Sequence, residues 1–145
     1  MKHKKYPKGN NLKQLIYTSR SVDGVDTDKL MEILTISKSS NIEKGISGLL
    51  VFDGAYFLAC LEGEADAVDG IFSKVIRDKR HTDVTILGEQ IIKYREFRTW
   101  NMSFLNRTDK LKEIILKSTG QTTFDPYALH YLKVKRLLLE LAIVI

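Results

Sequence analysis

The sequence predicts an α+β fold in which strand, helix, strand, strand, helix and strand precede an extra strand and two C-terminal helices. Three observations support this prediction. Short β-branched and aromatic runs alternate with stretches of helical periodicity, an Asp-Gly pair divides two apolar runs, and only Glu140 is polar among residues 137–145. The first six elements have the βαββαβ order of the ferredoxin-like fold, which places both helices on one face of the sheet.

The first strand and helix follow a basic arm, residues 1–11, which has no periodic apolar pattern and is expected to be flexible. Residues 12–18 are rich in β-branched and aromatic side chains and are predicted to form a strand. A helix is predicted to begin at Asp26 or Thr27 and to end near Asn41. Its inward face is marked by residues at helical spacing, namely Leu30, Ile33, Leu34 and Ser37.

Two apolar runs, residues 46–52 and 55–61, flank Asp53-Gly54. They are predicted to form a β-hairpin with a type I′ turn, in which both central residues have positive φ. Both runs are apolar on both faces, so the hairpin is expected to be covered on two sides. Residues 64–79 then form a predicted helix. Its apolar face consists of Val68, Ile71, Phe72, Val75 and Ile76.

The remaining elements are two predicted strands, residues 84–92 and 97–104, and two predicted helices, residues 108–117 and 126–143. The helices are expected to cap the open face of the sheet. Because the tail is so apolar, it must be buried on the sheet or in a second copy of the chain, which favours a homo-oligomer or a docking face for a partner. The predicted organisation is the arm 1–11, a core domain 12–105 and a helical cap 106–145.

Composition excludes several functional classes. Lys and Arg exceed Asp and Glu by 23 − 18 = 5, which suits a ligand with phosphate but is too small to indicate nucleic-acid binding. The single cysteine, Cys60, excludes an internal disulfide, and three scattered histidines do not indicate a metal site. No stretch approaches the ~18–20 apolar residues of a membrane span, and the N-terminus lacks a signal peptide, so a cytoplasmic protein without membrane contact is expected.

The sequence lacks the residues that two other functions of this fold, RNA binding and hydrolysis, would need. An RNA-binding module needs basic and aromatic residues that the run Gly45-Ile-Ser-Gly-Leu-Leu-Val-Phe52 lacks, although Tyr17 and Phe57 are aromatic. A hydrolase needs a nucleophile with its base, paired carboxylates or a metal. Asp78 and His81 are three residues apart, but alone they are typical of a charge cluster at the end of a helix. An enzyme is therefore not predicted.

Several sequence blocks follow one another in a specific order and spacing between residues 12 and 104. They are Leu15-Ile-Tyr-Thr-Ser19, Asn41, Gly45-Ile-Ser-Gly-Leu-Leu50, Phe57-Leu-Ala-Cys-Leu-Glu-Gly63, Arg77-Asp-Lys-Arg-His81 and Phe97-Arg-Thr-Trp-Asn-Met102. Together they resemble the BLUF family of blue-light sensors, and the helical tail is similar to that of its short, stand-alone members. The resemblance implies a non-covalently bound flavin, FAD preferred and FMN accepted, and a signal passed to a downstream protein partner.

The resemblance also implies which residues contact the flavin. In this family the ring lies between the two helices, so Ile33 and Val75 are expected on its two sides and the Asn41 amide at its carbonyl and N–H edge. Without the family, the first two are ordinary core residues and Asn41 is a helix C-cap. The remaining cofactor-binding candidates are Ser40 at a second ring carbonyl, Lys74 at the phosphate, and Asp78 and His81 near the flavin tail.

Tyr17 matches the residue that carries the photochemistry of the family, a phenol that donates an electron and then a proton to the excited flavin. Taken alone, it is a buried tyrosine that needs a partner for its hydroxyl group. Trp100 and Met102 match two residues of the last strand that trade places during signalling in this family. Without that likeness they are ordinary packing residues.

Position 59 departs from the family pattern. Relatives have a glutamine whose amide bridges the tyrosine and the flavin, and its rotation or tautomerisation is the light-driven switch. Ala59 has neither donor nor acceptor, so flavin binding is expected to survive while the red-shifted signalling state is not. The substitution is compatible with an engineered light-insensitive variant or with a natural member that senses redox state or nothing. The alternative function is a ferredoxin-like interaction module without cofactor or photoactivity.

Overall fold

The computed structural model describes residues 11–22, 28, 38–104 and 109–144. Residues 38–43 are helical. Apart from residue 28, the rest of the first predicted helix, including Ile33, lies outside the described residues. The other elements are β1 (Leu12–Ser21), β2 (Ser47–Phe52), β3 (Tyr56–Glu64), α2 (Ala65–Arg77), β4 (His81–Ile91), β5 (Trp100–Phe104), α3 (Asp109–Thr119), a short 3-10 helix (Pro126–Ala128) and α4 (Tyr131–Val144).

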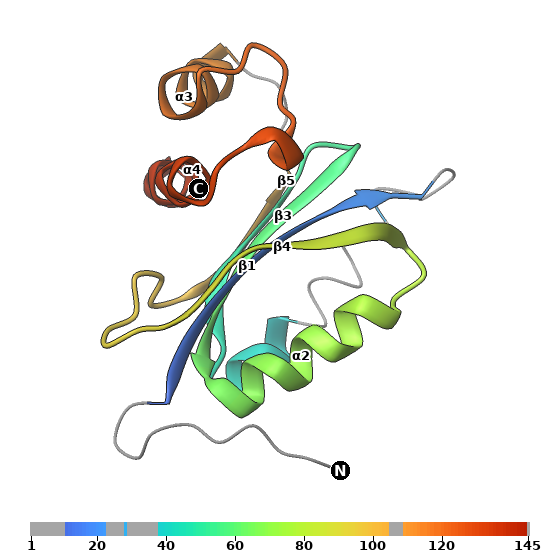
Figure 1. Cartoon of the computed structure of the whole chain (residues 1–145), viewed down its shortest axis with the longest axis vertical. Helices are drawn as coiled ribbons and strands as arrows, with labels where there is room; N and C mark the ends of the chain where they lie inside the picture. Colours follow the sequence, from blue (N-terminus) through green and yellow to red (C-terminus); the bar gives the residue numbers. More distant parts are fainter. Residues whose placement is uncertain (1–10, 23–27, 29–37, 105–108, 145) are drawn as a thin grey trace.

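The described strands form one sheet in the order β4-β1-β3-β2-β5. Neighbours among the first four are antiparallel, whereas β5 pairs in parallel with β2 at one edge. Helix α2 lies on one face of the sheet, and α3 and α4 lie on the other (Figure 1). This arrangement confirms the predicted α+β, ferredoxin-like fold with an extra strand and a helical cap.

Because side chains alternate along each strand, the sheet separates two apolar layers. The cap layer, on the side of α4, consists of the buried residues Ile16, Leu49, Val51, Leu58, Cys60, Phe97, Leu129, Val134, Leu137, Leu138 and Leu141. The pocket layer, on the side of α2, consists of Leu15, Tyr17, Ile46, Leu50, Phe52, Phe57, Ala59, Leu61, Val68 and Trp100. Strand β2 is buried along its whole length, as predicted for a hairpin covered on both sides.

The C-terminal helix covers the sheet, as its apolar sequence predicted. Four of its side chains, Val134, Leu137, Leu138 and Leu141, are fully buried. Burial of a side chain of this size stabilises a fold by roughly 1.5–3 kcal/mol. None of the helices in the described ranges combines the length and the apolar character that crossing a bilayer requires.

The hairpin turn does not have the predicted type I′ geometry. The connection has three residues, 53–55, and of these only Gly54 has a positive φ, +97°. The Asp53 carboxylate accepts hydrogen bonds from the backbone N of Ala55 (2.9 Å) and of Tyr56 (2.8 Å). This side-chain turn replaces the second positive-φ residue that a type I′ turn would need.

Other features also differ from the prediction. Strand β5 begins at Trp100 and not at residue 97, because the preceding backbone is bonded to the Glu62 carboxylate. The last predicted helix is interrupted, since Asp125 caps the short 3-10 helix and α4 begins only at Tyr131. Ile76 was predicted on the buried face of α2 but is 56% exposed, because it lies one position past Val75 and turns away from the sheet.

Candidate functional site

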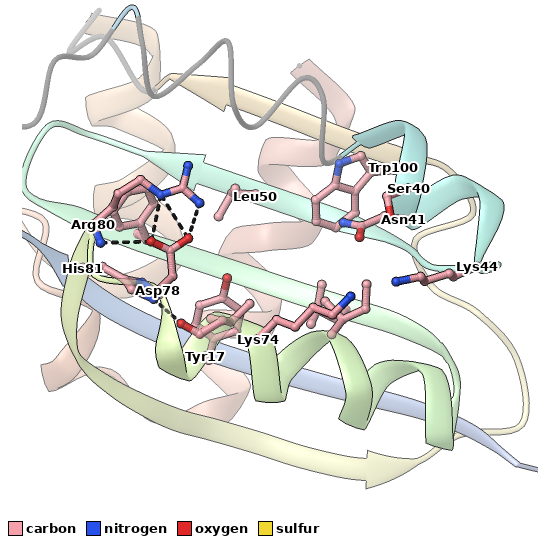
Figure 2. Close-up of a pocket in the computed structure, with 14 residues that line it drawn as sticks. Tyr17, Ser40, Asn41, Lys44, Leu50, Lys74, Asp78, Arg80, His81 and Trp100 are labelled. Carbon is pink, nitrogen blue, oxygen red and sulfur yellow. Dashed lines mark hydrogen bonds and ion pairs between the residues drawn. The ribbon is translucent and has the colours of Figure 1, made fainter.

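A cavity of about 320 Å³ lies between α2 and the pocket-layer face of the sheet (Figure 2). Small-molecule sites occupy roughly 300–1,000 Å³, so the space is large enough for a small ligand. The described residues that line it come from all five strands, from α2 and the residues just after it, and from the segment 40–44. They are Tyr17, Ser40, Asn41, Lys44, Leu50, Phe57, Leu61, Ile71, Lys74, Val75, Asp78, Arg80, His81 and Trp100.

The floor of the cavity is built on a row of paired residues in the centre of the sheet. Tyr17 on β1 pairs with Ala59 on β3, and Ala59 pairs with Leu50 on β2. Directly paired residues of antiparallel strands share a face and have Cβ atoms about 4.5–5.5 Å apart. Position 59 therefore lies beside Tyr17, and its fully buried side chain ends at a methyl group.

Tyr17 presents a buried phenol to this floor. Its side chain is 6% exposed, and its ring centroid lies 5.4 Å from that of Phe72. Burial raises the pKa of Tyr17 well above its ordinary value, and the Asp78 carboxylate raises it further. The hydroxyl group therefore keeps its proton at neutral pH and can act as a hydrogen-bond donor.

Asn41 supplies a buried amide at one end of the cavity. Its carbonyl accepts a hydrogen bond from Ile46 N (2.8 Å), which fixes the backbone just ahead of β2. The helix runs through residue 43, and Gly45 makes the left-handed turn after it with φ +73°, so Asn41 is not the C-cap. Its side-chain amide makes no hydrogen bond with the part of the chain that the structure describes and lines the cavity.

Two lysines give the cavity a positively charged rim. Lys44 follows the helical segment 38–43, whereas Lys74 lies on α2, and Figure 2 shows their amino groups directed toward each other. Contact with the Lys44 ammonium lowers the pKa of Lys74, and the Arg77 charge lowers it further. An anionic group placed between the two lysines would relieve this repulsion. Ser40 is exposed at the same end of the cavity.

The opposite end of the cavity holds Asp78, Arg80 and His81 (Figure 2). The Asp78 carboxylate accepts hydrogen bonds from the backbone N of Arg80 (2.9 Å) and from its Nε (2.8 Å), and the Arg80 guanidinium lowers the pKa of Asp78. His81 Nε2 lies 2.6 Å from the Val75 carbonyl oxygen, which can only accept, so Nε2 carries a proton. His81 Nδ1 lies 2.7 Å from Ser19 Oγ. These bonds join the end of α2 to β1 and β4.

Trp100 closes the cavity on the side of β5. Its side chain is 6% exposed, and its Nε1 has no hydrogen-bond partner among the residues described. Gly48 makes room for it, because a Cβ atom there would lie 3.3 Å from the Trp100 ring and 1.9 Å from the Cys60 carbonyl oxygen. Met102 pairs with Leu50 in the parallel register, and its side chain lies outside the described part of the structure.

The cavity thus gathers most of the residues singled out from the sequence, namely Tyr17, Ser40, Asn41, Lys74, Val75, Asp78, His81 and Trp100. Sequence reasoning missed Lys44 and Arg80. Arg80 had a signal, because it stands two residues after Asp78 and beside His81. Lys44 had none beyond its charge.

The arrangement can hold a flat aromatic molecule. Apolar side chains of the floor and of α2 can pack against its faces, the Asn41 amide can pair with a carbonyl and N–H edge, and the lysines can bind a negative charge. In the ranges that the structure covers, no group of three or more His, Cys, Asp or Glu residues is placed to hold a metal ion.

Known proteins resemble this chain over most of its length. The family model for sensors of blue-light using FAD, abbreviated BLUF, matches residues 12–103. The blue light- and temperature-regulated antirepressor BluF of Escherichia coli (strain K12) is 29% identical over 129 residues, 84% of this chain and 32% of that protein. The photoactivated adenylate cyclase subunit beta of Euglena gracilis is 29% identical over 94 residues, 63% of this chain and 11% of that protein. The chain thus spans about a third or less of the length of these relatives.

Solved structures agree with the family match. The photo-activated state of BlsA superposes with a TM-score of 0.80 and 30% identity, covering 91% of this chain and 95% of that one. The dark state of BlrB, a BLUF protein, has a TM-score of 0.74 and 24% identity over 94% of this chain and 98% of that one, which supports the fold. Because the family model covers well over half of the residues, the chain belongs to the BLUF family, the sensors of blue light using FAD.

Proposed function

We propose that the chain binds an oxidised flavin, FAD in preference to FMN, in the cavity beside Tyr17, and that Ala59 impairs its response to blue light. The family that matches the chain is one of sensors of blue light using FAD, as the sequence predicted. The observation that carries the proposal is the cavity itself. An apolar floor, a buried amide and a phenol surround one space with a basic rim, and these groups match a flavin ring and its phosphorylated tail.

The ring is proposed to lie against Val75 of α2, with Ile33 on its other side. Asn41 faces the carbonyl and N–H edge of the ring, because an amide offers both donors and an acceptor and this one is buried without a described partner. Ser40, at the same end of the cavity, faces a second ring carbonyl.

The tail of the flavin is proposed to meet charged side chains. Lys74 binds the phosphate, and Lys44 joins it, because the two ammonium groups repel each other until an anion lies between them. Asp78 and His81 are further candidates for contact with the tail, and both are held by hydrogen bonds to neighbouring backbone or side chains.

Tyr17 is proposed as the electron and proton donor. A bound flavin supplies an absorber of blue light that is a strong oxidant when excited. The Tyr17 hydroxyl holds its proton because burial raises its pKa. Of the Tyr, Phe and Trp side chains that line the cavity in the described residues, it is the one with a phenolic proton to release.

Ala59 is proposed to interrupt the light response. Its position beside Tyr17 is where the family's switch glutamine would place an amide between the phenol and the ligand. A methyl group can neither donate nor accept a hydrogen bond. Flavin binding therefore survives, whereas the red-shifted state does not form and the excited site returns to its starting state.

The visible spectrum of the purified chain tests both parts of the proposal. We expect a yellow protein that shows no reversible red shift under blue light. Ala59→Gln should gain the shift, and Tyr17→Phe in that background should lose it. Ala55→Gln, at an exposed position of the hairpin loop, is the matched control and should gain nothing. A colourless chain that takes up no added FAD or FMN would contradict flavin binding, and a full shift in the unaltered chain would contradict the role of Ala59.

Output is proposed to pass through protein contacts. Trp100 and Met102 on β5 are the signalling candidates, and α4 leaves Leu132 and Ile143 exposed for a downstream partner or a second copy of the chain. A second candidate function, an interaction module without cofactor, is favoured by these exposed side chains together with Ala59. The same spectrum distinguishes the two functions, because the interaction module would be colourless.

A further inference from the structure

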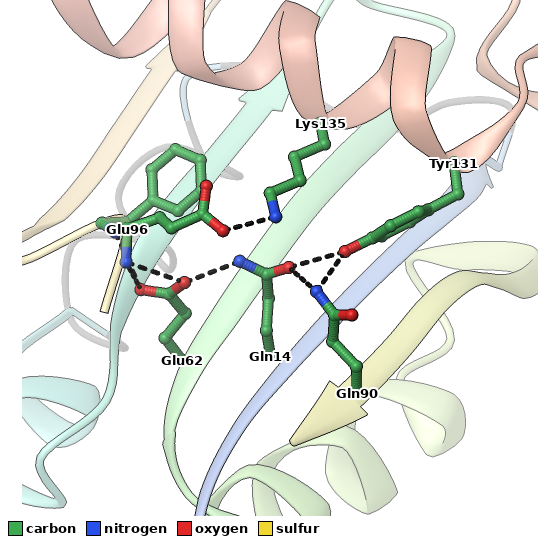
Figure 3. Close-up of polar contacts among 7 residues, drawn as sticks. Gln14, Glu62, Gln90, Glu96, Tyr131 and Lys135 are labelled. Carbon is green, nitrogen blue, oxygen red and sulfur yellow. Dashed lines mark hydrogen bonds and ion pairs between the residues drawn. The ribbon is translucent and has the colours of Figure 1, made fainter. Parts of the chain in front are cut away.

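Glu62 on β3 is a buried carboxylate on the face of the sheet opposite to the cavity. It is fully buried, and three donors reach it, namely the backbone N of Phe97 (2.8 Å), the backbone N of Glu96 (2.9 Å) and Gln14 Nε2 (2.7 Å). Figure 3 shows the carboxylate between Glu96 and Gln14. Removing it would leave buried donors without a partner, which costs more than the hydrogen bonds themselves contribute.

One side of this carboxylate holds the loop that leads into β5. Arg95 fixes the same loop from the edge of β2, donating to Ser47 Oγ (2.6 Å), to the Gly45 carbonyl (2.8 Å) and to the Glu62 carbonyl (3.1 Å). Trp100 follows Phe97 by three residues, and its indole lines the cavity. The place of Trp100 in the cavity therefore depends on the loop that Glu62 holds.

The other side of the carboxylate reaches α4 through Gln14. Tyr131, the first residue of α4, donates from its hydroxyl group to Gln14 Oε1 (3.0 Å), and Gln90 Nε2 donates to the Tyr131 hydroxyl (2.5 Å). Lys135, about one turn further along α4, forms an ion pair with Glu96 of the loop. Helix α4 thus rests on the same polar network at two points (Figure 3).

We propose that Glu62 is a positioning residue that couples the occupant of the cavity to the seating of α4. This inference rests on the proposed binding of flavin. A ligand that displaces Trp100 shifts the loop, the loop shifts the Glu62 carboxylate and its bond to Gln14, and Tyr131 then carries α4 to a different position. Because such coupling is reciprocal, the two positions of α4 bind the ligand with affinities that differ by the factor by which the ligand shifts α4, so a change at Tyr131 also alters the affinity of the cavity.

Hydrogen exchange of the α4 amides, measured on the full chain with and without saturating FMN, tests the coupling. We expect FMN to change these exchange rates by about five-fold or more, the lower end of typical coupling between sites. Tyr131→Phe should reduce this change and shift the dissociation constant of FMN by a comparable factor. Tyr127→Phe is the matched control, because Tyr127 bonds the Asp83 carbonyl (2.7 Å) outside the network, and it should leave both quantities unchanged.

A second comparison needs no flavin and separates the two proposals. Trp100→Phe shortens the side chain in the cavity, and in the unloaded chain it should alter α4 exchange. Glu62→Gln, which replaces an acceptor by a donor, should abolish that effect. Unchanged α4 exchange in both comparisons overturns the coupling, whether or not FMN binds. If FMN does not bind but Trp100→Phe alters α4 exchange, the proposed flavin function fails and the coupling stands.

Discussion

Replacing Gly88 of β4 by alanine tests how closely Tyr131 packs on the sheet. A Cβ atom at this position would lie 2.0 Å from Cδ1 and 2.3 Å from Cε1 of the Tyr131 ring. The ring must therefore move, and its hydroxyl group loses the hydrogen bonds with Gln14 and Gln90. Overpacking costs about 1–3 kcal/mol and each lost hydrogen bond about 1 kcal/mol, so the free energy of unfolding should fall by roughly 3–5 kcal/mol.

Urea unfolding followed by circular dichroism measures this loss. In a Tyr131→Ala background the clash is absent, and Gly88→Ala should then change the free energy of unfolding by less than about 1 kcal/mol. Gly70→Ala on α2 is the matched control, because no atom lies within 4 Å of its added Cβ, and it should stabilise the helix by up to about 1 kcal/mol. An equal loss for Gly88→Ala in both backgrounds would refute the reasoning.

Three further predictions concern the cavity. Arg80 lowers the pKa of Asp78, so the stability from this carboxylate is present above its ordinary pKa of 3.8 and is lost as the pH falls through the lowered pKa. Asp78→Asn should therefore reduce the loss of unfolding free energy on acidification. An unchanged loss would count against the ion pair. Lys44→Ala and Lys74→Ala should each weaken FMN binding, measured by fluorescence quenching, about two- to five-fold, and the effect should be smaller at high salt. Riboflavin binding, measured in the same way, should not change. An equal loss for riboflavin would exclude a phosphate contact. Ser19→Ala removes a partner of His81 and should cost about 1 kcal/mol in urea unfolding, whereas no loss would show that the contact contributes nothing.

Local patterns were sufficient to predict most of the fold. Windows of about ten residues are enough to recognise the apolar runs of β1, β2 and β3 and the apolar stripe on α2. The order of these elements along the chain is what indicated the ferredoxin-like fold. The turn at Asp53 was not predictable, because its carboxylate replaces a backbone conformation with two hydrogen bonds. The start of β5 was not either, since it depends on a bond between Phe97 and Glu62, 35 residues away in the chain.

Some residues of the candidate site could be identified from the sequence, and others could not. Tyr17 and Asn41 stand in blocks of distinctive spacing, and the cavity contains both. Leu50 and Phe57 could have been added from the register of the hairpin, because they share the face of Tyr17 and Ala59. Lys44 could not, because a charged residue in a turn has no periodic pattern, and only the folded chain shows that it approaches Lys74.

The two faces of the sheet sort the positions of the central strands by number. Odd residues of β1 and β3, such as Tyr17 and Ala59, lie in the pocket layer, whereas even residues, such as Gln14 and Glu62, meet the C-terminal helices or the loop beside them. Substitutions in the odd set would therefore alter the wall of the cavity directly. Substitutions in the even set would reach the cavity only through the Glu62 network, so the two faces can be altered by different routes.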